Sequence, residues 1–184
     1  MFLKNLSQEN NLESHLTVDS LALSNPLKLG LFEDILDDEI SLRVKVTGRS
    51  MKPFLYGGEI LTIKKAHHAS LKKGDLIFFK DRNGSPVLHR ITKKGTISVQ
   101  TKGDALMAFD EPICKNDVLG KVCVVEKANP DGKVKYINME SLIWRTNNYF
   151  IALINSIKTK TYLSARRIYR LQKEKKYSLN LFRS

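Results

Sequence analysis

The sequence predicts a mainly β protein, built as a folded, barrel-like antiparallel sheet with a helical C-terminal extension. Two observations predict this class. Between residues 41 and 137, short apolar or alternating runs of strand length are separated by turns that contain glycine, asparagine or proline. No helical segments alternate with these strands, as βαβ units would require. After about Met139 the apolar residues instead recur every three or four positions, which is the period of a helix.

The first elements precede the sheet. Residues 1–25 are polar with scattered leucines, and we expect a loosely ordered leader there. From Pro26 onward, apolar residues at helical spacing predict a short amphipathic helix with an acidic outer face. In residues 42–46, leucine and valine alternate with arginine and lysine, which predicts a half-buried strand that runs directly into Gly48.

The remaining strands follow at short intervals. They are predicted at residues 59–64, 76–79, 87–92, 96–101, 118–126 and 134–137. Asn83-Gly84 predicts a tight hairpin turn, because both residues tolerate positive φ. The chain is thus expected to divide into the leader 1–25, a β domain 26–137 that includes the short helix, and a basic amphipathic helical extension 138–184.

Charge is distributed unevenly along the chain, whose formal net charge is +12. Residues 1–41 hold eight acidic and two basic residues, whereas residues 158–184 hold nine basic residues and one acidic residue. A basic helix of this kind suits peripheral contact with an anionic membrane, and we regard nucleic acid as an unlikely partner. The alternative is that its aromatic residues simply pack the helix against the sheet; these are Trp144, Tyr149, Phe150, Tyr162 and Tyr169.

Other features indicate a cytoplasmic protein, with the inner membrane face as the place of any membrane contact. No run of 18 apolar residues predicts a membrane-spanning helix, and the N-terminus lacks the apolar region of a secretory signal. The two cysteines, Cys114 and Cys123, are expected to be reduced thiols and are too few for a zinc site. We expect neither a metal nor a cofactor.

Ser50 is the candidate nucleophile. It follows Gly48, which lets the chain bend at the strand end, and precedes Pro53, which fixes the next turn. A hydroxyl at this position can project from the sheet edge, with its own main-chain amide available to a developing oxyanion. The flanking residues Gly48, Met51 and Pro53 are the expected substrate-binding positions.

His89 is the candidate base. Strand alternation places it on the same face as Val87 and Ile91, in partly desolvated surroundings. A histidine there can take the proton of a serine hydroxyl, and an aspartate can hold its tautomer. Asp104, directly after a glycine, is one candidate for that third role, and Asp110 is the other.

Five runs in order resemble the type I signal peptidase family, which shares its fold with the LexA-like self-cleaving repressors. Gly48–Glu59 (GRSMKPFLYGGE) resembles the nucleophile box, and 71–77 (LKKGDLI) the strand that follows it. The run 87–91 (VLHRI) resembles the base-bearing strand, and 101–104 (TKGD) and 118–122 (VLGKV) the closing boxes. The resemblance covers about residues 42–127 and implies a serine endopeptidase on a LexA/signal-peptidase-like folded sheet.

Several departures from the family pattern bear on the mechanism. His89 stands where common bacterial members have a lysine, which is similar to the endoplasmic-reticulum-type and archaeal branch that uses Ser, His and Asp. Gly48 replaces a serine that donates to the oxyanion in many bacterial members, so backbone amides are the expected donors. Glu59 replaces the usual aspartate, with little expected consequence. The membrane anchor that typical members carry before the serine box is also missing from the pattern.

The sequence therefore favours a serine endopeptidase that cleaves an extended peptide or the leader segment of a precursor protein. The resemblance also implies small residues near the scissile bond. Two alternatives stay open: a LexA-like regulator that cleaves itself, and a non-catalytic peptide-binding module on the same fold.

Overall fold

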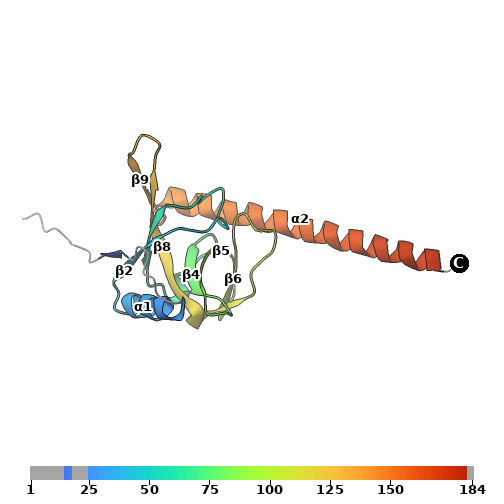
Figure 1. The fold of residues 1–184 in the computed structure, drawn as a ribbon, viewed down its shortest axis with the longest axis horizontal. Coiled ribbons are helices and arrows are strands. Elements are labelled where there is room, and N and C mark those ends of the chain that lie inside the picture. The colour runs from blue at the N-terminus through green and yellow to red at the C-terminus, as the bar shows by residue number, and fades with distance from the viewer. Residues whose placement is uncertain (1–14, 18–24, 182–184) are drawn as a thin grey trace, which may run out of the picture.

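A curled, mostly antiparallel sheet forms the centre of the structure, which is a computed structural model that describes residues 15–17 and 25–181 (Figure 1). The described strands are β1 (His15–Thr17), β2 (Ser41–Lys45), β3 (Ile60–Lys64), β4 (Leu76–Lys80), β5 (Pro86–Lys94), β6 (Ser98–Lys102), β7 (Ile113–Cys114), β8 (Val118–Ala128) and β9 (Val134–Asn138). The helices are α1 (Asn25–Asp37) and α2 (Leu142–Leu181), with short 3₁₀ turns at His68–Ser70 and Lys115–Asp117. The predicted class, mainly β with a C-terminal helix, is confirmed.

The strand order explains how distant segments come together. It runs β1-β2-β3-β8-β4-β5-β6-β7, with β9 also paired to β8. Only the β1–β2 pair is parallel among the described strands. The long strand β8 joins the β2–β3 half to the β4–β6 half, and its pairing shifts register at Thr62/Ile63 and at Phe78/Phe79. Such irregularities bend a sheet, so they help it to curl.

The buried apolar side chains of the sheet form two separate cores. The larger core lies under α1, whose Phe32 and Leu36 are buried against residues of β2, β3 and β8. Its aromatic contacts include Phe32 and Phe78, whose ring centroids are 5.5 Å apart. The smaller core consists of residues from β4 to β7 and the segment before β4; its buried members are Leu71, Ile77, Phe79, Ile91, Val99 and Ile113. Successive residues of β4 alternate between the two cores, because Leu76 and Phe78 belong to the larger one and Ile77 and Phe79 to the smaller one.

The C-terminal extension is one continuous helix, α2, from Leu142 to Leu181. α2 begins against the sheet and then projects beyond it (Figure 1). Its buried residues are small or polar, namely Asn148, Ala152, Ser156 and Thr159.

The aromatic residues of α2 do not pack it against the sheet, with one exception. Trp144 is half-buried and contacts Phe54, with ring centroids 5.8 Å apart. The others are exposed, namely Tyr149, Phe150, Tyr162 and Tyr169. The interpretation that these aromatics serve the helix–sheet contact is therefore wrong for Phe150, Tyr162 and Tyr169, whereas the exposed ring of Tyr149 lies 5.3 Å from Nζ of Lys73 in the turn before β4.

The predicted leader is described only in part. Residues 15–17 form β1, which pairs in parallel with Ser41–Arg43 of β2, so this part of the leader belongs to the sheet. Residues 1–14 and 18–24 lie outside the described part of the chain. Neither helix in the described ranges is long and apolar enough to cross a membrane.

Candidate active site

The turn that carries Ser50 is anchored in the larger core by apolar side chains. It follows β2, and main-chain hydrogen bonds close its base, from Val46 N to Glu59 O (2.8 Å) and from Gly58 N to Val46 O (2.7 Å). Ser50 itself is half-buried. Met51 and Leu55 insert into the larger core. The Met51 side chain therefore supports the turn from within and does not lie at the surface, where a substrate-binding position is expected.

The two other expected substrate positions lie at the surface. Gly48 and Pro53 are both exposed. A Cβ added at Gly48 would meet nothing within 4 Å, so this position borders open space. The turn thus has a buried underside at Met51 and an open outer side on which a substrate could rest.

Glu59 closes the same turn through its carboxylate. Oε1 accepts from the amide of Tyr56 and Oε2 from the amide of Gly57, each at 2.8 Å. Burial raises the pKa of Glu59, but these amides and its own lower it by more, so the pKa lies below its ordinary value. The residue that was expected to matter little is therefore an ionised cap that holds the Ser50 turn together.

His89 lies on β5, almost fully buried, on the face that contacts the smaller core. Its ring centroid is 6.2 Å from that of Phe79. Nδ1 donates to Oδ2 of Asp110 at 2.7 Å, and the hydroxyl of Thr101 donates to the same oxygen at 2.6 Å. An ionised carboxylate can only accept, so this contact places the proton on Nδ1 and leaves Nε2 as the acceptor in a neutral ring.

The environment keeps Asp110 ionised. Partial burial raises its pKa, but the hydrogen bonds from His89 and Thr101 and the charges of His89 and Lys102 lower it by more. The pKa of Asp110 therefore lies below its ordinary value. A charged carboxylate in this position holds the ring orientation and stabilises an imidazolium.

Asp104, the other aspartate considered for this role, does not contact His89. Its carboxylate pairs with Arg90, from Nε to Oδ1 at 2.9 Å and from Nη2 to Oδ2 at 2.8 Å. His89 and Arg90 are neighbours on β5 and project from opposite faces of the sheet, because side chains alternate along a strand. Of the two candidate aspartates, it is therefore Asp110 and not Asp104 that contacts His89.

Gly103 is the point at which the Ser50 turn meets the imidazole. A Cβ on Gly103 would lie 2.8 Å from the carbonyl oxygen of Ser50 and 3.0 Å from Nε2 of His89. Ala105, two residues after Gly103, donates its main-chain amide to the same carbonyl of Ser50 at 2.8 Å. The main chain of Ser50 and the acceptor nitrogen of His89 are therefore close neighbours, and only a residue without a side chain fits between them.

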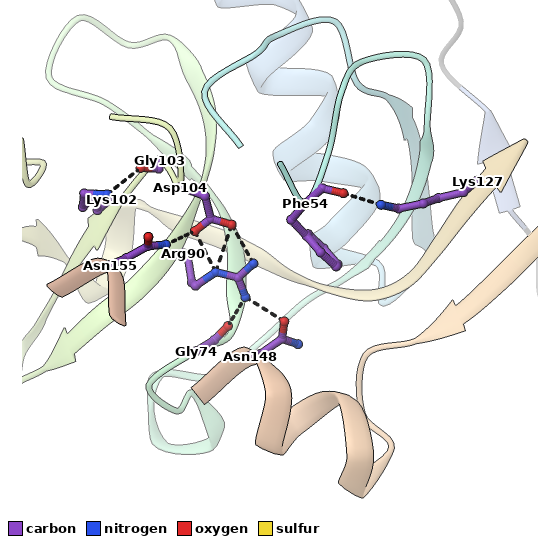
Figure 2. A network of polar contacts seen from close by, with 9 residues as sticks. All are labelled: Phe54, Gly74, Arg90, Lys102, Gly103, Asp104, Lys127, Asn148 and Asn155. Atoms are coloured by element: carbon purple, nitrogen blue, oxygen red, sulfur yellow. Dashed lines mark hydrogen bonds and ion pairs between the residues drawn. The ribbon is translucent and has the colours of Figure 1, made fainter. Parts of the chain in front are cut away.

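Arg90 connects the segments around the site (Figure 2). Its fully buried guanidinium binds Asp104, and Nη1 also donates to Gly74 O (3.1 Å) and to Oδ1 of Asn148 on α2 (2.7 Å). It also lies 5.2 Å from the ring centroid of Phe54, which belongs to the Ser50 turn. One side chain beside His89 thus contacts the Ser50 turn, the loop after β6 and α2.

Two lysines complete this network (Figure 2). Lys102 is buried, and its Nζ donates to Gly103 O at 3.1 Å. Burial lowers the pKa of Lys102, although Asp104 opposes the shift. Lys127 donates to Phe54 O, and its Nζ is 4.7 Å from the Phe54 ring centroid. These contacts hold the main chain at Gly103 and at Phe54 of the Ser50 turn.

An open groove of about 800 Å³ lies beside His89 and Asp110. It is lined by the β4–β5 hairpin, residues 79–84, and by the segment 110–113. Both signs of charge line the groove, with Lys80 and Arg82 beside Asp81 and Glu111, and Arg82 forms an ion pair with Glu111. Ser50 is not part of its lining, so the groove approaches the imidazole from the Asp110 side.

Some residues of the site were not singled out from the sequence. Thr101 and Gly103 lie in the 101–104 box, but their contacts with Asp110 and with Ser50 depend on the path of the loop between β6 and β7. Arg90 was read only as a neighbour of His89. Within the described ranges, no three histidine, cysteine, aspartate or glutamate side chains are placed to hold a metal ion.

The chain was compared with protein-family models, with curated proteins and with solved structures, and none of them matched. The resemblance to signal peptidases therefore stays a prediction that rests on the five sequence boxes. The geometry of the site stands independently of it.

Proposed function

We propose that this chain is a serine endopeptidase of the signal-peptidase-like kind, with Ser50 as nucleophile, His89 as base and Asp110 as the residue that orients it. The observation that carries the proposal is the Asp110–His89 hydrogen bond of 2.7 Å, with the other ring nitrogen beside the Ser50 main chain across Gly103. Three segments far apart in the sequence supply these groups. Their roles match those of a serine–histidine–aspartate triad.

The reaction follows from these roles. Ser50 Oγ gives its proton to Nε2 of His89 and bonds to the peptide carbonyl carbon, while Asp110 stabilises the imidazolium that forms. The imidazolium then protonates the leaving amine as the peptide bond breaks. Water, deprotonated by His89, hydrolyses the acyl–enzyme and restores Ser50. Main-chain amides at the Ser50 turn are the proposed oxyanion donors, since Gly48 offers no hydroxyl.

The substrate is proposed to bind as an extended strand beside the segment that leads from β2 to Ser50. One edge of β2 pairs with β3, and on the other edge β1 pairs with Ser41–Arg43. A peptide strand added beyond that pairing would run towards Ser50, which is the common way in which peptides extend a sheet. A peptide or precursor protein with an unfolded segment is thus the proposed substrate class.

The test is cleavage of a defined mixture of synthetic peptides by the full chain, followed by mass spectrometry. We expect new termini from the wild-type protein, and a loss of roughly a thousandfold or more in rate for Ser50→Ala and His89→Ala. Asp110→Asn should lose at least about a hundredfold. The matched controls are Ser70→Ala and Asp131→Asn, which lie outside both the triad and the groove and should cleave as the wild type does.

Other outcomes distinguish the alternatives. Ser50-dependent shortening of the chain itself, without cleavage of added peptides, would identify a self-cleaving regulator. Binding of peptides with no Ser50-dependent cleavage would identify a binding module. Full activity of Ser50→Ala would remove Ser50 from the mechanism.

A further inference from the structure

The helix α2 turns its polar side toward the sheet and an apolar side outward. Small and polar side chains face the sheet, namely Asn148, Ala152, Ser156 and Thr159. On the opposite side of the helix, one row of large apolar side chains is between 53% and 72% exposed; its members are Ile143, Phe150, Ile154, Ile157 and Ile168, here called the outer stripe. Helices of globular proteins normally bury such a stripe, so its exposure calls for a partner.

The spacing shows that the outer stripe is one continuous face. Its members follow one another at intervals of seven, four, three and eleven residues, each close to a whole number of helical turns. The buried residues Asn148 and Ala152 lie on the opposite side of the helix by the same count. The contact with the sheet therefore leaves the stripe entirely open.

Basic residues border this stripe. At about 100° per residue, Lys158 and Lys160 lie on its two opposite margins. Farther along the helix, Arg167 is exposed near the same margin as Lys160, whereas Arg166 and Arg170 are exposed on the side opposite the stripe. Across Leu142–Leu181 there are nine basic residues and a single acidic one, Glu174. Long basic side chains at the margins can lay their apolar stems along the stripe while their charges reach an anionic surface.

We propose that the outer stripe of α2 docks onto a lipid surface with anionic headgroups, with the helix lying in the plane of the interface. The stripe supplies the apolar contact and the bordering bases supply the attraction, which together are the two requirements of an interfacial helix. The part of α2 that projects past the sheet extends this surface beyond the body of the molecule (Figure 1).

The charge balance argues against the other occupants. Two copies that paired through this face would bring together two helices that each carry nine bases and one acid, so the copies would repel one another. Nucleic acid would satisfy the bases but leave the apolar stripe in water. Of these three occupants, an anionic lipid surface is the one that satisfies both the apolar stripe and the bases.

Vesicle co-sedimentation of the full chain tests this proposal. The probes are vesicles of phosphatidylcholine alone and vesicles that contain one third phosphatidylglycerol. We expect binding to the anionic vesicles and little to the neutral ones. Phe150→Ser/Ile154→Ser/Ile157→Ser should weaken the binding by roughly tenfold or more, because it removes most of the buried apolar area. Lys158→Gln/Lys160→Gln should weaken it by about fivefold or more, because each charge contributes near the surface.

The control variant Ile97→Ser/Tyr136→Ser changes equally exposed apolar residues outside α2 and should bind as the wild type does. Ser50→Ala should also bind unchanged, so this test is independent of the proposed peptidase activity. The proposal is overturned if the wild type ignores anionic vesicles, or if the triple stripe variant binds them equally well. It is also overturned if sedimentation shows a dimer that the triple variant dissociates, since the stripe would then bind a second copy.

Discussion

Neighbouring residues on β5 serve two different sides of the sheet. His89 contacts Asp110 on the face of the smaller core, whereas Arg90 contacts Asp104 and α2 on the other face. Both side chains are almost fully buried, and each has an aspartate partner from the loop after β6. Asp104 and Asp110 look equivalent in the sequence, but because they have different partners, their substitution is expected to affect different properties of the protein.

Exchange of the two aspartates for asparagine should separate these consequences. Asp104→Asn leaves the Arg90 guanidinium buried without its countercharge, and we expect the free energy of unfolding to fall by about 3 kcal/mol or more. Asp110→Asn should reduce the unfolding free energy less and should act mainly on kcat, because the His89 tautomer is no longer held. Chemical denaturation and peptide cleavage measure the two effects, and the opposite ranking would contradict the assignment of Asp110.

At the scale of elements, α2 is held on the sheet by polar and close main-chain contacts. Asn148 and Asn155 bind Arg90 and Asp104, each through a single hydrogen bond of 2.7–2.8 Å. Gly74 has a φ of +99°, and a Cβ there would lie 2.7 Å from main-chain atoms of Asn148 and Tyr149. The turn before β4 and the first turns of α2 therefore touch backbone to backbone.

Gly74→Ala tests how much this close approach contributes. The added methyl group must displace α2 and also strain a positive-φ position, so we expect the unfolding free energy to fall by about 2–4 kcal/mol. Gly84→Ala is the matched control, since Gly84 also has a positive φ (+71°) but has no atom within 4 Å of an added Cβ. It should lose only about 1 kcal/mol from backbone strain. Equal losses in the two variants would show that the α2 contact is not tight.

For the molecule as a whole, charge links stability to pH. The net charge of +12 grows as carboxylates are protonated, so self-repulsion increases in acid. The pKa values of Glu59 and Asp110 are both lowered in the folded state. Such groups stabilise the fold fully above their unfolded pKa values, near 4, and this stabilisation is lost as the pH falls through the folded values.

Glu59→Gln should therefore flatten the acid side of the stability profile. At about pH 6 the variant should be less stable than the wild type, because Tyr56 and Gly57 lose a charged acceptor. Towards about pH 3 the two free energies of unfolding should converge, since Glu59 of the wild type is then being protonated. Urea denaturation at a series of pH values measures this difference, and parallel profiles would rule out a lowered pKa for Glu59.

Much of the fold follows from local pattern. Alternation in 42–46 and 87–92, the turns between strands and the change to helical spacing after Met139 determined the class, seven of the strands and the C-terminal helix, because each depends on residues close in sequence. The short strands β1 and β7 have no such local signal. The same alternation placed His89 on a buried face with Val87 and Ile91. The order of the boxes identified Ser50 and His89 as candidates.

The tertiary structure alone decided the rest. Which aspartate reaches His89 depends on the path of the loop after β6, and that path is determined by the Arg90–Asp104 pair and by Gly103 against Ser50. Which face of α2 meets the sheet depends on the buried charge of Arg90, which needs polar partners such as Asn148 and so turns the apolar side outward. Sequence periodicity identifies an apolar face, but the partner of that face is determined by contacts between segments far apart in the chain.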